Sequence, residues 1–119
     1  MAKINMTVTL DSPEEKSQKK LAGDLMENQI SYVDGGFFVN LKWEKDQLIL
    51  TKANKDYKIT LNLQKDKSQC VYEDLHSQMG LTMRVSNETF IIGNDYIALS
   101  YVIEDRNEIN YRIEYEVQE

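Results

Sequence analysis

The only cysteine and the only histidine of the chain lie six residues apart, in the stretch CVYEDLHSQMG at residues 70–80. Such a pair is typical of a hydrolase when the thiolate lies within about 3 Å of the imidazole and a third group orients the base. Cys70 alternates with Tyr72, however, and we expect it to point into the core, where a thiol is desolvated and unreactive. We therefore interpret the stretch as a strand that begins at Cys70, a connection that contains His76, and Gly80 at the start of the next strand.

Metal and cofactor motifs have specific residue requirements. A zinc site uses three or four ligands drawn mainly from Cys and His, and this chain has one of each. A calcium loop needs regularly spaced oxygen ligands and a glycine, a spacing that neither 93–95 nor 105–108 provides. The sequence has no Gly-rich phosphate loop, nucleophile elbow or dinucleotide fingerprint. We predict no metal, no cofactor and no catalytic residue.

Paired carboxylates are a third source of chemistry, because two acids can act together as general acid and base. Glu73 adjoins Asp74, and Glu114 and Glu116 share one face of an expected strand. Two acids that are two residues apart on a strand, as Glu114 and Glu116 are, lie about 7 Å from each other, within the range that glycosidases use. A general acid needs burial to raise its pKa, and these residues alternate with the apolar face. We expect all four to lie in water.

The elements that would position these residues are strands, because apolar and polar side chains alternate along most of the chain. Residues 57–64, YKITLNLQ, and 109–117, INYRIEYEV, show the pattern most clearly. A period of two places one set of side chains on a buried face and the other in water. Similar apolar rows are formed by Ile4, Met6, Val8 and Leu10; Phe37, Val39, Leu41 and Trp43; Leu81, Met83 and Val85; and Ile97, Leu99, Tyr101 and Ile103.

Short turn signals separate these rows. The candidates are Asp34-Gly35-Gly36, Asn54-Lys55-Asp56, Lys65-Asp66-Lys67, Ser86-Asn87-Glu88, Gly93-Asn94-Asp95 and Asp105-Arg106-Asn107. Gly, Asn and Asp tolerate the positive φ of tight hairpins. Residues 12–28 are ambiguous, because Ser12, Pro13 and Glu15 have the spacing of a helix start, whereas Gly23 and poor apolar spacing oppose a long helix. Both a short helical turn and a loop leading into a strand near 17–26 stay open.

The spacing of the strands predicts an all-β fold. Strands every 8 to 12 residues with short turns imply antiparallel neighbours, because parallel pairing needs long crossovers. A sheet of about eight to ten strands closes to avoid exposed edges, which favours an up-and-down β-barrel over the rival β-sandwich. At 119 residues the chain suits a single barrel domain over residues 1–119.

The carboxyl-terminal part of the sequence resembles a known family. From Cys70 onward the order is a Tyr-containing strand, a short link to Gly80, the strand LTMRVS, an acidic turn, the strand YIALSYVIE and the strand INYRIEYEV. This order is similar to that of the YwiB-like family of small bacterial proteins, over about the last 75 residues. The resemblance implies a lipocalin-like (calycin-like) β-barrel and no established activity. The link from Asp74 to Met79 departs from the family's usual Thr-Pro, and no functional residue is carried over.

Charge and cysteine usage limit the partners and the compartment. Fourteen basic and twenty acidic residues give a net charge of −6, which opposes binding to nucleic acids and anionic membranes. The amino terminus lacks the apolar run of a signal peptide, and no stretch approaches the length of about 20 residues that crosses a bilayer. A single cysteine fits a reducing compartment. We therefore expect a cytoplasmic protein.

Aromatic side chains supply the candidate barrel-interior or pocket residues: Trp43, Tyr57, Tyr72, Tyr101, Tyr111 and Tyr115. Each aromatic side chain buries about 150 to 250 Å² of surface, which favours a partly filled barrel. Such a barrel could bind a small apolar or amphipathic ligand in its mouth, without catalysis. The alternative is a protein-interaction or dimerising module, such as a homodimer, with a filled barrel and with Phe38, Ile49, Val71 and Val102 on its outer face. A hydrolase centred on His76 is the least favoured.

Overall fold

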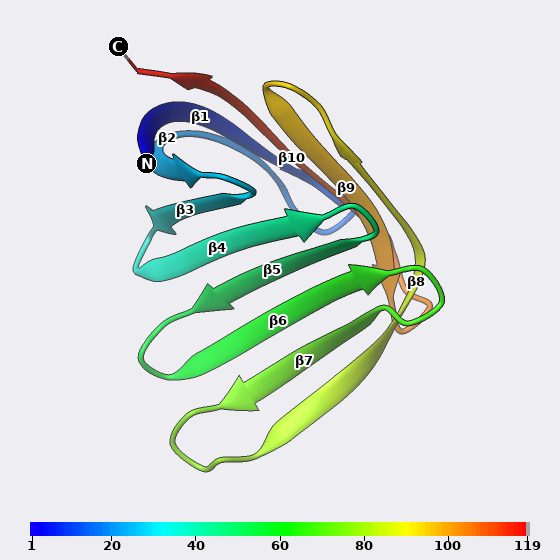
Figure 1. Cartoon of the computed structure of the whole chain (residues 1–119). Helices are drawn as coiled ribbons and strands as arrows, with labels where there is room; N and C mark the ends of the chain where they lie inside the picture. Colours follow the sequence, from blue (N-terminus) through cyan, green and yellow to red (C-terminus); the bar gives the residue numbers. More distant parts are fainter. Residues whose placement is uncertain (119) are drawn as a thin grey trace.

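The computed structural model describes residues 1–118, which form ten strands joined by short turns (Figure 1). The strands are β1 (Ala2–Asp11), β2 (Lys16–Met26), β3 (Gln29–Asp34), β4 (Phe37–Glu44), β5 (Gln47–Ala53), β6 (Tyr57–Gln64), β7 (Gln69–Asp74), β8 (Gly80–Ile92), β9 (Tyr96–Ile103) and β10 (Glu108–Val117). This part of the chain contains no helix, and so none that could cross a membrane.

The sheet is closed. Each strand pairs antiparallel with the next along the chain, and β1 also pairs with β10, with Ile4 opposite Val117 and Asp11 opposite Asn110. The expected all-β, antiparallel up-and-down barrel is therefore confirmed, with ten strands. Closure leaves no open sheet edge in the described part of the barrel, which removes the unpaired backbone groups that invite aggregation.

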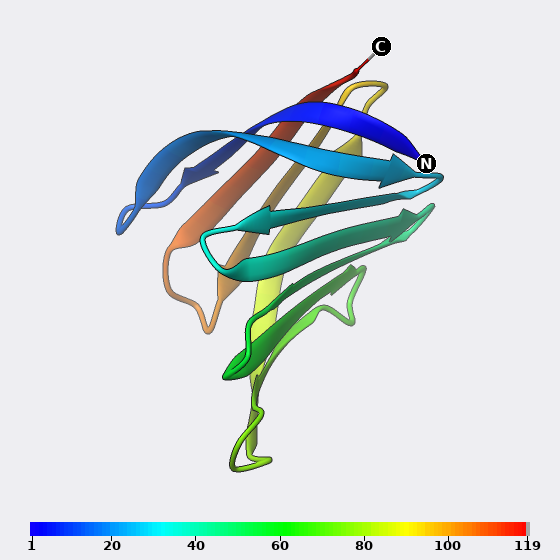
Figure 2. The same ribbon diagram turned by 90° about the vertical axis from the view of Figure 1, so that its left-hand side faces the viewer.

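The two ends of the barrel differ, and each carries one set of turns. We call the end with turns 12–15, 35–36, 54–56, 75–79 and 104–107 the open end, and the end with turns 27–28, 45–46, 65–68 and 93–95 the packed end. In Figure 2 the turns of the open end lie toward the left and bottom, and the β7–β8 hairpin extends furthest. In Figure 1, β4 to β7 run across the view, whereas β9 and β10 run steeply through it.

The core lies inside the barrel and is made by the alternating apolar rows. Paired residues share a face of the sheet, so Val8, Ile113 and Ile97 point inward from three neighbouring strands. The side chains that are almost completely enclosed are Ile4, Ile30, Leu41, Leu48, Leu63, Ile97 and Ile113. Most of them lie in the half of the barrel near the packed end, so this half is filled by its own side chains.

Residues 12–28 form a turn and a strand rather than a helix. The Ser12 hydroxyl accepts a hydrogen bond from the backbone N–H of Glu15 at 3.1 Å, the interaction that the helix-start pattern implied. Here it closes the β1–β2 turn, because β2 pairs with β1 from Asp11 opposite Lys16 to Ala2 opposite Leu25. A ten-residue ladder outweighs the weak helical preference of this segment.

The expectation of a turn at Ser86-Asn87-Glu88 is wrong. Strand β8 continues through these residues to Ile92, and the register with β9 shifts between Ser86 and Thr89. Asn87 has a positive φ of 52°, which a hairpin turn and a β-bulge both use. The left-handed residue is therefore a bulge inside a long strand. By contrast, the turn signal at Gly35 and Gly36 is confirmed, with φ values of 56° and 90°.

Candidate functional site

The open end of the barrel holds an apolar cavity of about 540 Å³. Its apolar lining comes from Leu81, Met83, Ile103 and Ile109, which continue the inward rows of β8, β9 and β10. Its rim is polar and comes from turns 12–15 and 104–107: Ser12, Glu14, Glu104, Arg106 and Asn107. Leu81 is 59% exposed although it faces inward, so apolar surface at this end is left uncovered by the chain itself.

A row of aromatic side chains leads away from this cavity along the inner wall. Tyr72 is the cross-strand partner of Leu81, and its ring centroid lies 5.4 Å from that of Tyr57. Tyr57 packs edge-on against Phe37 at 5.6 Å. All three rings are only partly buried. The cavity and the aromatic row together form one continuous, half-exposed apolar wall, which we call the mouth of the barrel.

A cluster of three tyrosines lies one layer below the mouth; Tyr32 and Tyr101 are buried, and Tyr111 is partly buried. Tyr32, Tyr101 and Tyr111 are each two positions further into the barrel than Asp34, Ile103 and Ile109 on the same strands. The hydroxyls of Tyr32 and Tyr111 are hydrogen-bonded to each other.

Burial dominates the acid–base properties of these tyrosines. It raises the pKa of Tyr32 and that of Tyr101 to about 12, and raises the pKa of Tyr111 further. The neutral phenols therefore form a polar layer under an apolar mouth, and they can donate or accept hydrogen bonds without carrying charge.

The rim of the cavity is fixed by a strained turn after β9. Glu104 and Asp105 both have positive φ, at 52° and 55°. The Glu104 carboxylate accepts the backbone N–H of Arg84 at 2.7 Å, the Glu104 N–H donates to the Arg84 carbonyl, and the Arg84 guanidinium pairs with Asp105. These contacts join the turn to β8 beside Met83 and Ile103. They hold two non-glycine residues in a conformation that costs about 1–2 kcal/mol each.

The sequence-based candidates fall into three places. Tyr57 and Tyr72 lie together in the aromatic row, and Tyr101 and Tyr111 lie in the tyrosine layer beneath, Tyr101 buried and Tyr111 partly buried. Trp43 is buried near the packed end, far along its strand from the mouth.

Tyr115 also lies toward the packed end. Its hydroxyl donates to the carbonyl of Asn94 at 3.3 Å, and partial burial raises its pKa.

Two groups at the open end escaped the sequence analysis. Tyr32 was not among the candidates, although its spacing from Ile30 places both on one face of β3. Lys19 and Lys52 occupy inward positions, opposite Val8 on β1 and Ile59 on β6. Lys52 continues the every-second-residue row of Leu48 and Leu50, so the sequence alone places it on the inner face.

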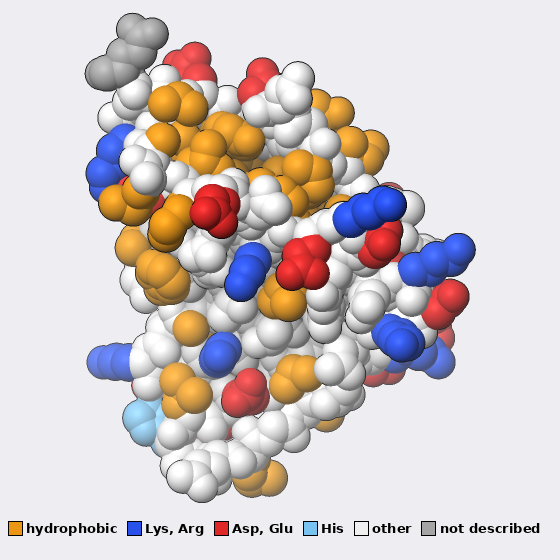
Figure 3. Space-filling view, viewed as in Figure 1, with side chains coloured by type: hydrophobic (Ala, Val, Ile, Leu, Met, Phe, Trp, Pro, Cys, Tyr) orange, Lys and Arg blue, Asp and Glu red, His pale blue; other side chains and the backbone are white. Residues whose placement is uncertain are grey.

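The stretch at 70–80 does not assemble a hydrolytic site. Cys70 is buried in the core, and burial raises the pKa of its thiol. His76 is an exposed turn residue whose Nε2 lies 2.9 Å from a carboxylate oxygen of Asp56. The pale blue histidine in Figure 3 lies at the lower left, beside the turns that precede β6 and β8 in Figure 1. The thiol and the imidazole therefore face different environments.

Asp74 organises this turn through backbone contacts. Its carboxylate accepts the N–H groups of Ser77 and His76, at 3.1 and 2.9 Å, and these bonds lower its pKa. An anionic carboxylate in such a position caps a turn. The role of Asp74 in the structure is thus to shape the β7–β8 connection.

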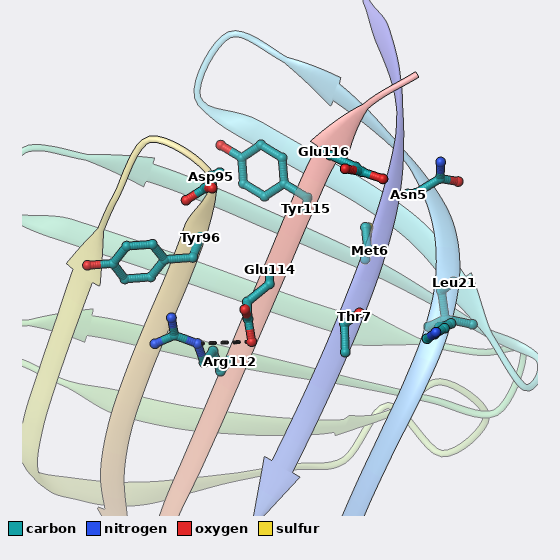
Figure 4. Close-up of a pocket in the computed structure, with 11 residues that line it drawn as sticks. Asn5, Met6, Thr7, Leu21, Asp95, Tyr96, Arg112, Glu114, Tyr115 and Glu116 are labelled. Atoms are coloured by element: carbon teal, nitrogen blue, oxygen red, sulfur yellow. Dashed lines mark ion pairs between the residues drawn. The ribbon is translucent and has the colours of Figure 1, made fainter. Parts of the chain in front are cut away.

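A second, larger hollow of about 640 Å³ lies on the outer face over β2, β1 and β10 (Figure 4). It contains one of the acid pairs singled out above, Glu114 and Glu116, on the solvent side of β10. Arg112 forms an ion pair with Glu114 at 3.3 Å and lies 4.5 Å from the ring centre of Tyr96. Neither glutamate is buried, so the condition for a general acid is absent.

Metal ligands do not gather in the described part of the chain. Residues 1–118 contain no group of three or more His, Cys, Asp or Glu side chains placed to hold an ion. Within the same residues, every enclosed side-chain nitrogen or oxygen has a hydrogen-bond partner. What the fold offers chemically is an apolar cavity with a polar rim.

The fold and this site define the chain as a small ten-stranded antiparallel β-barrel with one packed end and one open end. The crystal structure of the YwiB protein from Bacillus subtilis is similar to it, with 10% sequence identity and a TM-score of 0.43, over 98% of this chain and 91% of that one. No family model matches the sequence. No curated protein matches it either.

Proposed function

We propose that this protein is a cytoplasmic barrel that binds a small apolar or amphipathic molecule at its open end and does not catalyse a reaction. The observation that carries the proposal is the cavity of about 540 Å³ behind Leu81, Met83, Ile103 and Ile109. Ligand sites have volumes of about 300–1,000 Å³ and combine an apolar lining with a few polar groups. The rim residues supply the polar groups.

Exposed apolar surface supports this proposal energetically. Each square ångström of apolar surface removed from water contributes about 25 cal/mol. Leu81, Tyr57 and Tyr72 are inward-facing and incompletely buried, so a ligand in the mouth would cover surface that the chain leaves wet. The interior beneath them is filled, which limits the ligand to the mouth.

A bulky substitution in the mouth tests the proposal. We expect Nile red, an uncharged fluorescent probe, to bind the wild-type protein saturably. Leu81→Trp fills the mouth and should weaken binding at least tenfold. Thr82→Trp adds the same bulk one residue away on the exposed outer face of β8 and should leave binding unchanged. Absence of a saturable signal, together with no retained mass in native mass spectrometry of protein from its own host, would reject the proposal.

A dimerising module is the second candidate, and one cross-strand pair favours it. Val33 and Phe38 lie opposite each other on the outer face of β3 and β4, and they are 62% and 53% exposed. Of the other outer-face residues expected from the sequence, Val102 is buried outside the core cluster. Sedimentation velocity at high protein concentration tests this candidate: a monomer that Phe38→Ser leaves unchanged would exclude this pair as a dimer contact.

A further inference from the structure

An unexpected charge lies on the inner wall of the mouth. On β5 the inward row runs Leu48, Leu50 and Lys52, and Lys52 is paired with Val39 on one side and Ile59 on the other. Val39 is buried, and Ile59 packs against the core. Because paired residues share a face, the lysine belongs to the inner face at the open end.

The ammonium of Lys52 is held by an aromatic ring rather than by an acid. Its Nζ lies 4.5 Å from the ring centre of Phe37, the last ring of the aromatic row counted from the cavity. None of the ion pairs found within residues 1–118 includes Lys52. Lys19, the other inward lysine at this end, does have an acidic partner: its Nζ lies 3.0 Å from a carboxylate oxygen of Asp34.

A cation beside an apolar wall complements an anion with an apolar body. Contact with a ring face attracts the ammonium only weakly at an exposed site, and it leaves the N–H donors of the ammonium free for an acceptor. A carboxylate or sulfate oxygen forms the stronger, charge-assisted kind of hydrogen bond. The rings of Phe37, Tyr57 and Tyr72 follow one another from Lys52 toward Leu81 and the cavity.

We infer that the ligand of the open end is an amphipathic anion, with its charged head at Lys52 and its apolar part along Tyr57 and Tyr72 toward the cavity. This inference rests on the proposed function and adds the chemical class of the ligand. The charges on the rim of the cavity set the orientation of the ligand. Two acids, Glu14 and Glu104, lie there with one base, Arg106, and this excess of negative charge disfavours an anionic head group at the cavity. The head therefore lies at the aromatic end, and the tail at the aliphatic end.

Three probes with the same chain and different heads test this inference: decanoate, decanol and decyltrimethylammonium, each below its micelle concentration and titrated by calorimetry. We expect the wild type to bind decanoate about tenfold more tightly than decanol, and the cation most weakly. A factor of ten corresponds to about 1.4 kcal/mol, the scale of one charge-assisted contact that is partly open to water. The preference should shrink at high salt, which screens exposed charges.

Substitutions assign that preference to one residue. Lys52→Met keeps the length and apolar stem of the side chain, and it should make decanoate and decanol bind equally while decanol affinity is retained. Lys58→Met is the matched control, because Lys58 lies on the outer face of neighbouring β6 at the same end. It removes the same net charge and should keep the tenfold preference.

The outcomes separate the two proposals. If the wild type binds decanol and decanoate equally, or if Lys58→Met removes the preference as fully as Lys52→Met does, the inference about Lys52 is wrong and the binding function stands. If none of the three probes binds, the binding function itself fails.

Discussion

The hydroxyl groups of Tyr32 and Tyr111 are hydrogen-bonded across the interior of the barrel, although β3 and β10 are not neighbours in the sheet. Strands β2 and β1 lie between them, so this bond links residues 79 positions apart in the chain. Both side chains come from inward rows, and the bond crosses just beneath the mouth. It therefore fixes the floor on which a ligand would rest.

Removing one partner of this pair should destabilise the barrel. Tyr111→Phe leaves the buried Tyr32 hydroxyl without its acceptor or donor, which costs about 1–3 kcal/mol. Urea unfolding followed by circular dichroism measures the loss. The double variant Tyr32→Phe, Tyr111→Phe should be more stable than the sum of the two single losses implies, because it leaves no orphaned hydroxyl. Strictly additive losses would contradict a coupled pair.

Alkaline pH should unfold the protein through its buried phenols. The pKa of Tyr32 and that of Tyr101 are each raised from 10.0 to about 12, so the unfolded chain loses these protons first. The stabilising effect is fully present below pH 10 and is lost as the pH rises through 12, at about 1.4 kcal/mol per pH unit for each group. Denaturant unfolding at a series of pH values measures this slope.

One substitution isolates the contribution of a single phenol. Tyr101→Phe removes one titrating group. It should make the fall in unfolding free energy between pH 10 and 12 less steep, by about 1.4 kcal/mol per pH unit. A slope that stays the same in this variant would mean that Tyr101 ionises equally in the folded and unfolded states.

Glycine at position 23 is required by packing. A Cβ there would lie 2.6 Å from the Sδ of Met6 and 3.0 Å from the backbone oxygen of Ser31. Gly23→Ala should therefore cost about 1–3 kcal/mol by overpacking beside Tyr32. Gly80→Ala is the control, because its Cβ would meet only the Tyr72 oxygen at 3.4 Å and should change stability little. Equal effects of the two substitutions in thermal unfolding would contradict this explanation.

His76 should be dispensable. Its ion pair with Asp56 is exposed, and exposed pairs contribute about 0–1 kcal/mol. The same turns stay joined by the Leu75 N–H, which donates to the Asp56 carbonyl at 2.9 Å. We expect His76→Ala to change the unfolding free energy by less than about 1 kcal/mol and to alter no hydrolysis measured across a broad ester and amide panel. A hydrolytic rate that falls with this substitution would revive the hydrolase hypothesis.

Much of the fold could be predicted because a period of two is a local property of the sequence. Ile59, Leu61 and Ile113 lie on inward rows as their alternation indicates. Turn chemistry was less decisive. The Ser12 to Glu15 contact forms in a hairpin as readily as in a helix, and the positive φ of Asn87 serves a bulge as well as a turn. Pairing partners decide between these outcomes, and they lie far away in sequence.

The site was harder to predict than the fold, because it depends on where the rows end. Leu81 and Ile103 were expected on apolar rows, but only the three-dimensional arrangement shows that these rows meet at an incompletely filled end. Similarly, alternation places Lys52 on the inner face, but its position over Phe37 follows from the pairing of β4 with β5. The candidates Trp43 and Tyr115 share the inward pattern and lie toward the other end.

The most direct measurement of the central claim is a titration of the labelled protein with decanol, followed by methyl NMR. Binding in the mouth predicts saturable shift changes at Leu81, Met83, Ile103 and Ile109, with Leu63 at the packed end and Val33 on the outer face unaffected. Shift changes centred on Val33, or no saturable change at the four cavity methyl groups, would contradict a ligand site at the open end.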